Sequence, residues 1–259
     1  AKMNKEVKLA KEAALEAGNL ILNYYKADYE IRDKGYHNPV TTADHASDKR
    51  IKEILTQSFP NYGWLSEETV VSKDRLKNQR VWVVDPLDGT KEFIECIPHF
   101  SVSIALVHDG RPVVGVIYNP ATDEMFSCQK GKGVYLNGNK VNASQKTNLF
   151  DASITVSRSE VKRNEWDPYR NDFKSINPIG SVAYKLALVS SGNYDIFTTI
   201  APKNEWDICA GDCLVSEAGG VFKTINDKKI IYNQKKTLVT DTIIATNSVL
   251  FDGVSDLLF

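Results

Sequence analysis

The segment 85–90, Asp-Pro-Leu-Asp-Gly-Thr, places two carboxylates three residues apart, directly after the apolar run Val81–Val84. The apolar run predicts a buried strand, and Pro86, which has no amide hydrogen and a fixed φ, should end it. Both carboxylates would then lie at the carboxyl edge of the strand, where α/β folds commonly bind ligands. Carboxylates held close together repel each other unless one is protonated or a cation lies between them. The segment therefore indicates a site for a hard divalent cation, although Asp-Pro and Asp-Gly are equally typical of a tight turn.

The residues that follow the second carboxylate are suited to bind phosphate. Gly89 allows a ligand to approach the backbone closely, and Thr90-Lys91-Glu92-Phe93 is typical of the start of a helix. Free N–H groups at a helix N-terminus favour an anion such as phosphate. One short segment could therefore hold a metal ion and a phosphate together.

Four more acidic residues, in three segments, are candidates for the same site. Glu67-Glu68 follows the apolar pair Trp64-Leu65, and Asp207 follows Trp206 at an expected helix start. Asp44 lies in the pattern Thr41-x-x-Asp44, which is typical of a capping box. Each has a simpler explanation when taken alone: a solvated acidic pair, an acid that faces the helix dipole, and a helix cap.

Together these segments resemble the inositol monophosphatase superfamily of Mg²⁺-dependent, often lithium-sensitive phosphatases. The matching segments have the order and spacing of the family and cover nearly the whole chain. They are Val40-Thr41-Thr42-Ala43-Asp44, Ser66-Glu67-Glu68, Trp82 to Thr90, Trp206-Asp207-x-x-Ala210-Gly211 and Glu217-Ala218-Gly219-Gly220. The resemblance implies an α+β fold, the five-layered αβαβα sandwich of the inositol monophosphatase and sugar phosphatase type.

The resemblance also implies the metal ligands. Glu67, Asp85 and the backbone carbonyl of Leu87 would hold the first of two or three Mg²⁺ ions, and Glu67 would also touch a weaker third ion. Asp85, Asp88 and Asp207 would hold the second. Bound Mg²⁺ lowers the pKa of water and neutralises charge on phosphoryl oxygens. Li⁺ is an expected inhibitor.

Catalytic and phosphate-binding residues follow from the same resemblance. The Thr90 hydroxyl, paired with Asp44, would help to orient and deprotonate the attacking water, and Glu67 is a third candidate catalytic residue. Gly89 and Thr90 would bind the phosphate through their backbone N–H groups. Lys34 falls where the family carries a lysine near the site. No covalent phospho-enzyme is needed for this chemistry.

Several segments resemble one branch of the superfamily, the bacterial 3'(2'),5'-bisphosphate nucleotidases, which convert 3'-phosphoadenosine 5'-phosphate to AMP. Lys91-Glu92-Phe93 follows Asp-Gly-Thr, where inositol phosphatases usually have Thr-Asn-Phe. The segments Gly180–Lys185 and Pro202–Asp207 also resemble the nucleotidases. In the first of these, Ser181 and Lys185 are candidate substrate-binding residues. Lys185 could pair with a second phosphate as a point charge, although an exposed helix lysine explains it equally well.

Position 200 supports the nucleotidase interpretation, and another segment opposes it. Inositol phosphatases usually have a sugar-binding glutamate seven positions before the Trp-Asp aspartate, but this chain has Ile200, which could pack against a base or a ribose. In contrast, Ile97–Leu106 resembles the inositol phosphatases. The expected function is Mg²⁺-dependent hydrolysis of 3'(2')-phosphoadenosine 5'-phosphate to AMP and phosphate. Inositol 1-phosphate or another sugar phosphate is the alternative substrate.

The elements that must position these residues can be predicted from periodicity and turn residues. Helices are expected at 3–25, 43–58, 181–191, 207–218 and the end of the chain, and strands at 81–84, 152–157, 194–199, 220–225 and 241–246. Asp109-Gly110 predicts a hairpin of strands 101–107 and 112–118, and a second hairpin is expected around Asn137-Gly138. The mixture is typical of an α+β or layered α/β class. A boundary near 145–151 would separate an N-terminal α+β subdomain, 1–148, with most metal ligands from a C-terminal α/β subdomain, 149–259, that supplies Asp207 and substrate contacts.

Composition restricts location and partners. The 259 residues are 42% hydrophobic, carry a net charge of -1 and contain no apolar run long enough to span a membrane. The neutral charge argues against nucleic acid as the main partner. The four cysteines are interpreted as free thiols in a reducing compartment, so we expect the protein to be cytoplasmic. Its expected partner is a small phosphorylated substrate, and the enzyme could be a homodimer. Because some relatives act in RNA transcription, a non-catalytic binding module is the remaining alternative.

Overall fold

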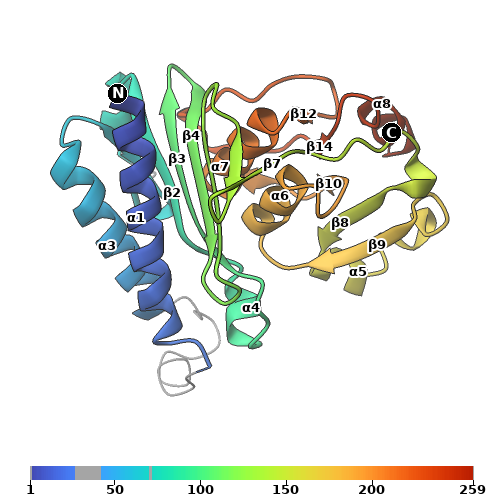
Figure 1. Ribbon diagram of the computed structural model, residues 1–259, viewed down its shortest axis with the longest axis horizontal. Helices are drawn as coiled ribbons and strands as arrows, with labels where there is room; N and C mark the ends of the chain where they lie inside the picture. The colour runs from blue at the N-terminus through green and yellow to red at the C-terminus, as the bar shows by residue number, and fades with distance from the viewer. Residues whose placement is uncertain (1, 27–41, 70–71, 259) are drawn as a thin grey trace.

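The computed structural model describes residues 2–26, 42–69 and 72–258. It has five layers (Figure 1). Helices α1 (Lys2–Leu22) and α3 (Thr42–Ser58) cover one face of a seven-stranded sheet. Helices α6 (Val182–Ser190) and α7 (Glu205–Glu217) lie between this sheet and a five-stranded sheet, whose outer face packs against α5 (Arg158–Lys162) and α8 (Phe251–Leu258). The predicted αβαβα sandwich is confirmed.

The seven-stranded sheet has its strands in chain order. They are β1 (Gly63–Leu65), β2 (Arg80–Asp88), β3 (Ser101–His108), β4 (Arg111–Asn119), β5 (Glu124–Gln129), β6 (Val134–Leu136) and β7 (Asn139–Val141). The pair β1–β2 is parallel and the others are antiparallel. Both predicted hairpins are confirmed, because Asp109-Gly110 and Asn137-Gly138 adopt the positive φ angles that tight hairpin turns require.

Strand β2 continues past the proline that was predicted to end it. Val81–Asp85 pair in register with β3, the pairing shifts between Asp85 and Asp88, and Asp88 pairs again with Ser101. Pro86 has no N–H to donate to the ladder, so the strand bulges there and resumes two residues later. The prediction that the strand stops at Pro86 was wrong. The bulge instead places two carboxylates on one continuous strand.

The outer helices match their predicted ranges closely. α1 turns small residues toward the sheet, and Ala10, Ala13, Ala14 and Ala17 are fully buried. α3 buries Ala43, Ser47, Ile51 and Leu55 at helical spacing. Thr41 of the expected capping box and Lys34 of the expected loop lie outside the described residues.

The five-stranded sheet has the order β12-β14-β10-β8-β9. Its strands are β8 (Ser153–Ser157), β9 (Ser175–Ile179), β10 (Ile196–Thr199), β12 (Val221–Thr224) and β14 (Ile243–Thr246). A small pair, β11 (Lys203–Asn204) with β13 (Leu238–Val239), precedes α7. Strands β5 and β9 were not predicted, and β9 contains a proline, which an edge strand tolerates.

One hydrophobic core joins the two sheets through α6 and α7, since it contains buried residues of both sheets and of both helices. The chain passes from the first sheet to the second between Val141 and Ser153. The division into subdomains at 148/149 stays a prediction. No helix within the described residues is long and apolar enough to cross a membrane.

Helix α7 approaches the first sheet closely at Gly115 of β4. A Cβ at position 115 would lie 2.8 Å from the carbonyl oxygen of Ala210 and 3.0 Å from Cβ of Cys213, both on α7. A backbone carbonyl cannot rotate away as a flexible side chain can. Gly115 therefore sets how near α7 lies to the sheet.

The Gly115→Ala substitution should lower the free energy of unfolding by about 1–3 kcal/mol, because the methyl group overpacks this contact. Urea denaturation would measure the change. Gly253→Ala in α8 is the matched control, since its nearest neighbour is the tip of the Leu149 side chain at 3.2 Å. That variant should gain up to about 1 kcal/mol from helix propensity. Equal stability of the Gly115→Ala variant and the wild type would contradict the packing argument.

Candidate metal centre

A cavity of about 580 Å³ brings together residues that the sequence spreads over 164 positions, from Asp44 to Asp207. It lies where β2, α3, α4 (Thr90–Ile94), the 3₁₀ helix η1 (Glu67–Thr69) and the N-terminus of α7 meet. Every predicted metal-binding or catalytic residue lines it. These residues are Asp44, Glu67, Asp85, Leu87, Asp88, Gly89, Thr90 and Asp207.

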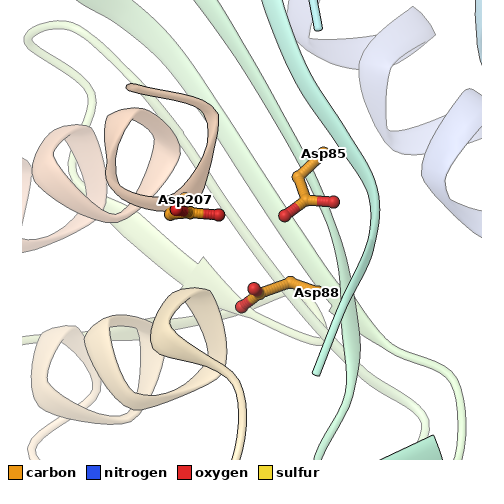
Figure 2. A group of neighbouring side chains, drawn as sticks. All are labelled: Asp85, Asp88 and Asp207. Carbon is orange, nitrogen blue, oxygen red and sulfur yellow. The ribbon is translucent and has the colours of Figure 1, made fainter. Parts of the chain in front are cut away.

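Three carboxylates form the centre of this cavity. Asp85 and Asp88 extend from β2 and Asp207 from the first turn of α7, and the three side chains point toward one another (Figure 2). One oxygen of each lies within 4.8 Å of the others. Among the described residues this is the group of acidic, histidine or cysteine side chains that is close enough to share a metal ion.

Local hydrogen bonds hold Asp85 and the bulge beside it. The Leu87 N–H donates to Oδ1 of Asp85 at 3.2 Å. The hydroxyl of Ser47, on the buried face of α3, donates to the Pro86 carbonyl at 2.7 Å. The bulge is therefore anchored to the outer helix layer as well as to its own sheet.

Asp88 and Asp207 are each tied to a helix start. The Ser181 hydroxyl and the Ala183 N–H, at the N-terminus of α6, donate to Oδ2 of Asp88 at 2.5 and 2.9 Å. The Asn204 N–H donates to Oδ2 of Asp207 at 3.0 Å. Asp207 thus has the helix-start role that was its simpler explanation, and it also faces the other two carboxylates.

The electrostatics of the cluster favour a bound cation. Burial raises the pKa of Asp85 well above its usual value, and the charges of Asp88, Asp207 and Asp44 act in the same direction. The pKa of Asp207 is raised to about 7, chiefly by burial and then by Asp88. Such carboxylates either keep protons or share a cation, and an all-oxygen set suits a hard divalent ion such as Mg²⁺. The residues present therefore fit the metal that the sequence implied.

The other predicted residues lie around this centre. Glu67 is exposed and lines the cavity from η1, outside the group of three carboxylates. Gly89, with φ of 91°, precedes α4, and a Cβ there would lie 2.6 Å from the carbonyl oxygen of His99. Only glycine fits this conformation and this approach. Asp44 lines the cavity from α3, and Thr90 is the first residue of α4.

Ser181 and Lys185 line a second, adjoining cavity of about 280 Å³. The Ser181 hydroxyl is engaged, because it donates to Asp88 and accepts from the Tyr184 N–H at 3.0 Å. Lys185 is 2% exposed, which differs from the exposed helix lysine that the sequence left open. Their roles in substrate binding stay predictions.

Sequence reasoning assigned no role to Asp48, Ser66 and Asn204 of the first cavity or to Arg158 and Lys203 of the second, although Ser66, Lys203 and Asn204 lie in segments that carry the resemblance. Asp48 follows Asp44 by four residues on α3, so helical spacing could have placed both on one face. Arg158 carried no such signal, since it follows a strand that joins the site only in the folded chain.

Comparison with known proteins gives a consistent result. The model of the inositol monophosphatase family matches residues 2–254. Inositol monophosphatase 2 of Solanum lycopersicum is 35% identical over 97% of both chains, and Nus factor SuhB of Pasteurella multocida is 33% identical over 86% of both. The solved structure of an inositol monophosphatase from Anabaena (Nostoc) sp. PCC 7120 superposes with a TM-score of 0.83 and 29% identity, and the match covers 100% of this chain and 96% of that one.

The raised carboxylate pKa values predict how stability and metal binding depend on pH. The unfolded chain releases these protons near pH 4, whereas the folded chain keeps the proton of Asp207 up to about pH 7. Stability in EDTA should therefore fall as the pH rises from about 5 to about 7.5. Because Mg²⁺ competes with these protons, the increase in melting temperature that Mg²⁺ causes should grow over the same interval.

Thermal denaturation at several pH values, with EDTA or with Mg²⁺, would measure both trends. Asp207→Asn is the control, because it removes the titrating group with little change in shape. In EDTA, the stability of this variant should fall less with rising pH than that of the wild type. If Mg²⁺ raised the melting temperature of the wild type equally at pH 5.5 and pH 7.5, the proposed competition between Mg²⁺ and protons would be contradicted.

Proposed function

The chain belongs to the inositol monophosphatase family, and from this premise we propose that it is a Mg²⁺-dependent phosphomonoesterase whose preferred substrate carries a second phosphate group. The first candidate substrate is 3'(2')-phosphoadenosine 5'-phosphate, which would give AMP and phosphate. The observation that carries the proposal is the basic cavity beside the three carboxylates.

In this proposal the chain holds the metal with Asp85, Asp88 and Asp207, together with Glu67 and the carbonyl of Leu87. The bound metal supplies an activated water and neutralises phosphoryl charge. Thr90 and Asp44 line the same cavity and would orient that water and take its proton, while the N–H groups of Gly89 and Thr90 would hold the phosphate.

The second cavity shares Asp88, Gly89 and Thr90 with the first, so it lies where the leaving group of a bound phosphate ester would extend. Four basic side chains line it, against the two acidic side chains of Asp88 and Glu92. The basic residues are Lys91, Arg158, Lys185 and Lys203. A metal on Asp88 would increase this positive excess. The neutral hydroxyls of an inositol ring would not compensate this positive charge, whereas a second phosphate group would.

The basic side chains are partly held in place. Nζ of Lys185 donates to the Ile179 carbonyl at 2.6 Å, and burial lowers its pKa to about 8. Arg158 bridges Glu92 at 3.2 Å and Glu95 at 3.0 Å. A bound dianion would favour the charged form of Lys185. Because Lys185 is already held in place, binding would cost little side-chain entropy.

Ile200 supports a substrate with an apolar part. It is 47% exposed and follows Thr199, which lines the second cavity. Phe197, Ile179 and Val182 add apolar surface to that cavity. A base or a ribose could pack on such a surface, whereas a polyol hydroxyl would find no carboxylate at position 200.

Two alternatives have support from the relatives. The tomato protein is named an inositol monophosphatase, which favours inositol 1-phosphate, and the Pasteurella protein is named a Nus factor, which favours a role in transcription. The net charge of -1 argues against a nucleic-acid partner as the main one.

The cytoplasmic location is supported by the four cysteines, which are all free thiols. Homodimer formation and Li⁺ inhibition stay predictions.

The Asp85→Asn and Asp207→Asn variants should each lose at least about a thousandfold in turnover, because each removes a charged metal ligand and leaves the shape of the side chain. Phosphate release at saturating Mg²⁺ measures turnover, and circular dichroism confirms folding. Asp227→Asn is the matched control, since Asp227 is exposed and pairs with Lys223 of β12, at the edge of the five-stranded sheet. A near-wild-type rate in either ligand variant would refute the assignment.

The substrate assignment is tested by phosphate release with Mg²⁺ from 3'-phosphoadenosine 5'-phosphate, inositol 1-phosphate and fructose 1,6-bisphosphate. We expect kcat/KM for the nucleotide to exceed that for inositol 1-phosphate by at least about tenfold, equivalent to one charge-assisted contact. Lys203→Met should narrow this preference about tenfold, whereas Lys223→Met should leave it unchanged. Preference for inositol 1-phosphate would refute the second-phosphate proposal, and turnover of none of the three would favour the transcription role.

A further inference from the structure

The carboxylate Glu205 is buried two residues before Asp207 and does not line either cavity. It is the first residue of α7 and is 1% exposed. Its two oxygens accept hydrogen bonds from successive backbone groups, the Asn233 N–H at 2.6 Å and the Gln234 N–H at 3.0 Å. Its own N–H donates to the Thr237 carbonyl at 3.1 Å. The start of α7 is therefore clamped to the segment 233–237.

The same segment is fastened to Arg75, which is 3% exposed and lies in the 3₁₀ helix η2 (Asp74–Lys77). Nη1 of Arg75 donates to Oδ1 of Asn233 at 2.8 Å, and Nδ2 of Asn233 donates to the Arg75 carbonyl at 3.1 Å. The charge of Glu205 also acts on Arg75. Asn233 thus connects η2 with α7.

A third attachment ties this segment to the first sheet. The Tyr232 N–H donates to the Gly110 carbonyl at 2.8 Å, at the turn between β3 and β4. Arg111 donates to the Ile230 carbonyl at 2.6 Å. Residues 230–237 therefore form a strap that joins α7 to the sheet from which Asp85 and Asp88 extend.

The strap connects the segments that carry the candidate metal ligands. Arg75 lies in the connection between Glu67 and Asp85, and Glu205 precedes Asp207. A shift of the first turn of α7 would move Asp207 away from Asp85 and Asp88, whose mutual repulsion already opposes their approach. We propose that Glu205, clamped by the strap, is a positioning residue that fixes Asp207 at the metal centre. This inference rests on the proposed metal site.

Glu205→Gln tests the role because glutamine keeps the shape but offers one acceptor oxygen and a donor where two backbone donors converge. Titration calorimetry with Mg²⁺ alone measures the dissociation constant without turnover. We expect it to rise about tenfold, the usual effect of removing a group that orients a metal ligand. Thermal denaturation in EDTA measures the accompanying loss of stability.

Glu160→Leu is the control. Glu160 is another buried glutamate, 2% exposed, whose Oε1 accepts from the Trp166 indole at 2.8 Å on the outer side of the second sheet. Leucine cannot accept this bond, so the variant should lose stability in EDTA but keep the Mg²⁺ affinity of the wild type. An equal loss of affinity in both variants would overturn the positioning role, because it would show a general effect of destabilisation.

Asn233→Gly provides a second variant if Glu205→Gln fails to fold. Asn233 has φ of 62°, which glycine adopts readily, so the change removes only the side-chain bonds to Arg75. We expect a threefold or larger rise in the Mg²⁺ dissociation constant. If the wild type binds Mg²⁺ and the folded variants bind it with the same affinity, the positioning role of Glu205 is overturned but the proposed metal site is not. Absence of Mg²⁺ binding by the wild type would overturn the proposed metal site, and the inference with it.

Discussion

Asp85, Asp88 and Asp207 repel one another, yet the fold holds an oxygen of each within 4.8 Å of the others. Burial and like charges raise the pKa values of Asp85 and Asp207, so bringing these groups together costs free energy. Hydrogen bonds from Leu87, Ala183 and Asn204 hold the three groups from separate directions. The fold thereby maintains an arrangement that favours a cation and that no single element could impose.

Helix α7 is the element on which this arrangement depends most, because it supplies the one carboxylate that does not come from β2. It is buried on nearly all sides, between the two sheets and against α6. Close packing therefore holds the body of the helix rigidly. Gly115 allows the middle of the helix to approach the first sheet, and the strap at residues 230–237 clamps its first turn. The position of Asp207 is therefore set at two points along the helix.

The sequence predicted the elements with strong periodicity or clear turn residues. Its family resemblance also pointed to Asp85, Asp88 and Asp207, which the structure brings together. The Asp109-Gly110 and Asn137-Gly138 hairpins follow from the positive φ angles that these pairs accept. Strand β9 was missed because its polar residues and Pro178 give no alternating pattern, and it is stabilised by pairing with β8. The continuation of β2 past Pro86 depends on Ser101, a distant partner. The Glu205 clamp likewise joins residues that local pattern cannot relate.

Asp88 links the two cavities electrostatically. One of its oxygens accepts from Ser181 and Ala183 at the start of α6, and Lys185 follows in the same turn of that helix. The negative charge of Asp88 favours the protonated form of Lys185 against the effect of burial. A cation bound to Asp88 would weaken the attraction between Asp88 and Lys185, so another anion would be required to stabilise the charged lysine. In the proposed function a second phosphate in the adjoining cavity would supply one, so a cation in the first cavity and an anion in the second would stabilise each other. The acidic and basic side chains on either side of this short strand-to-helix turn are what such a coupling would require.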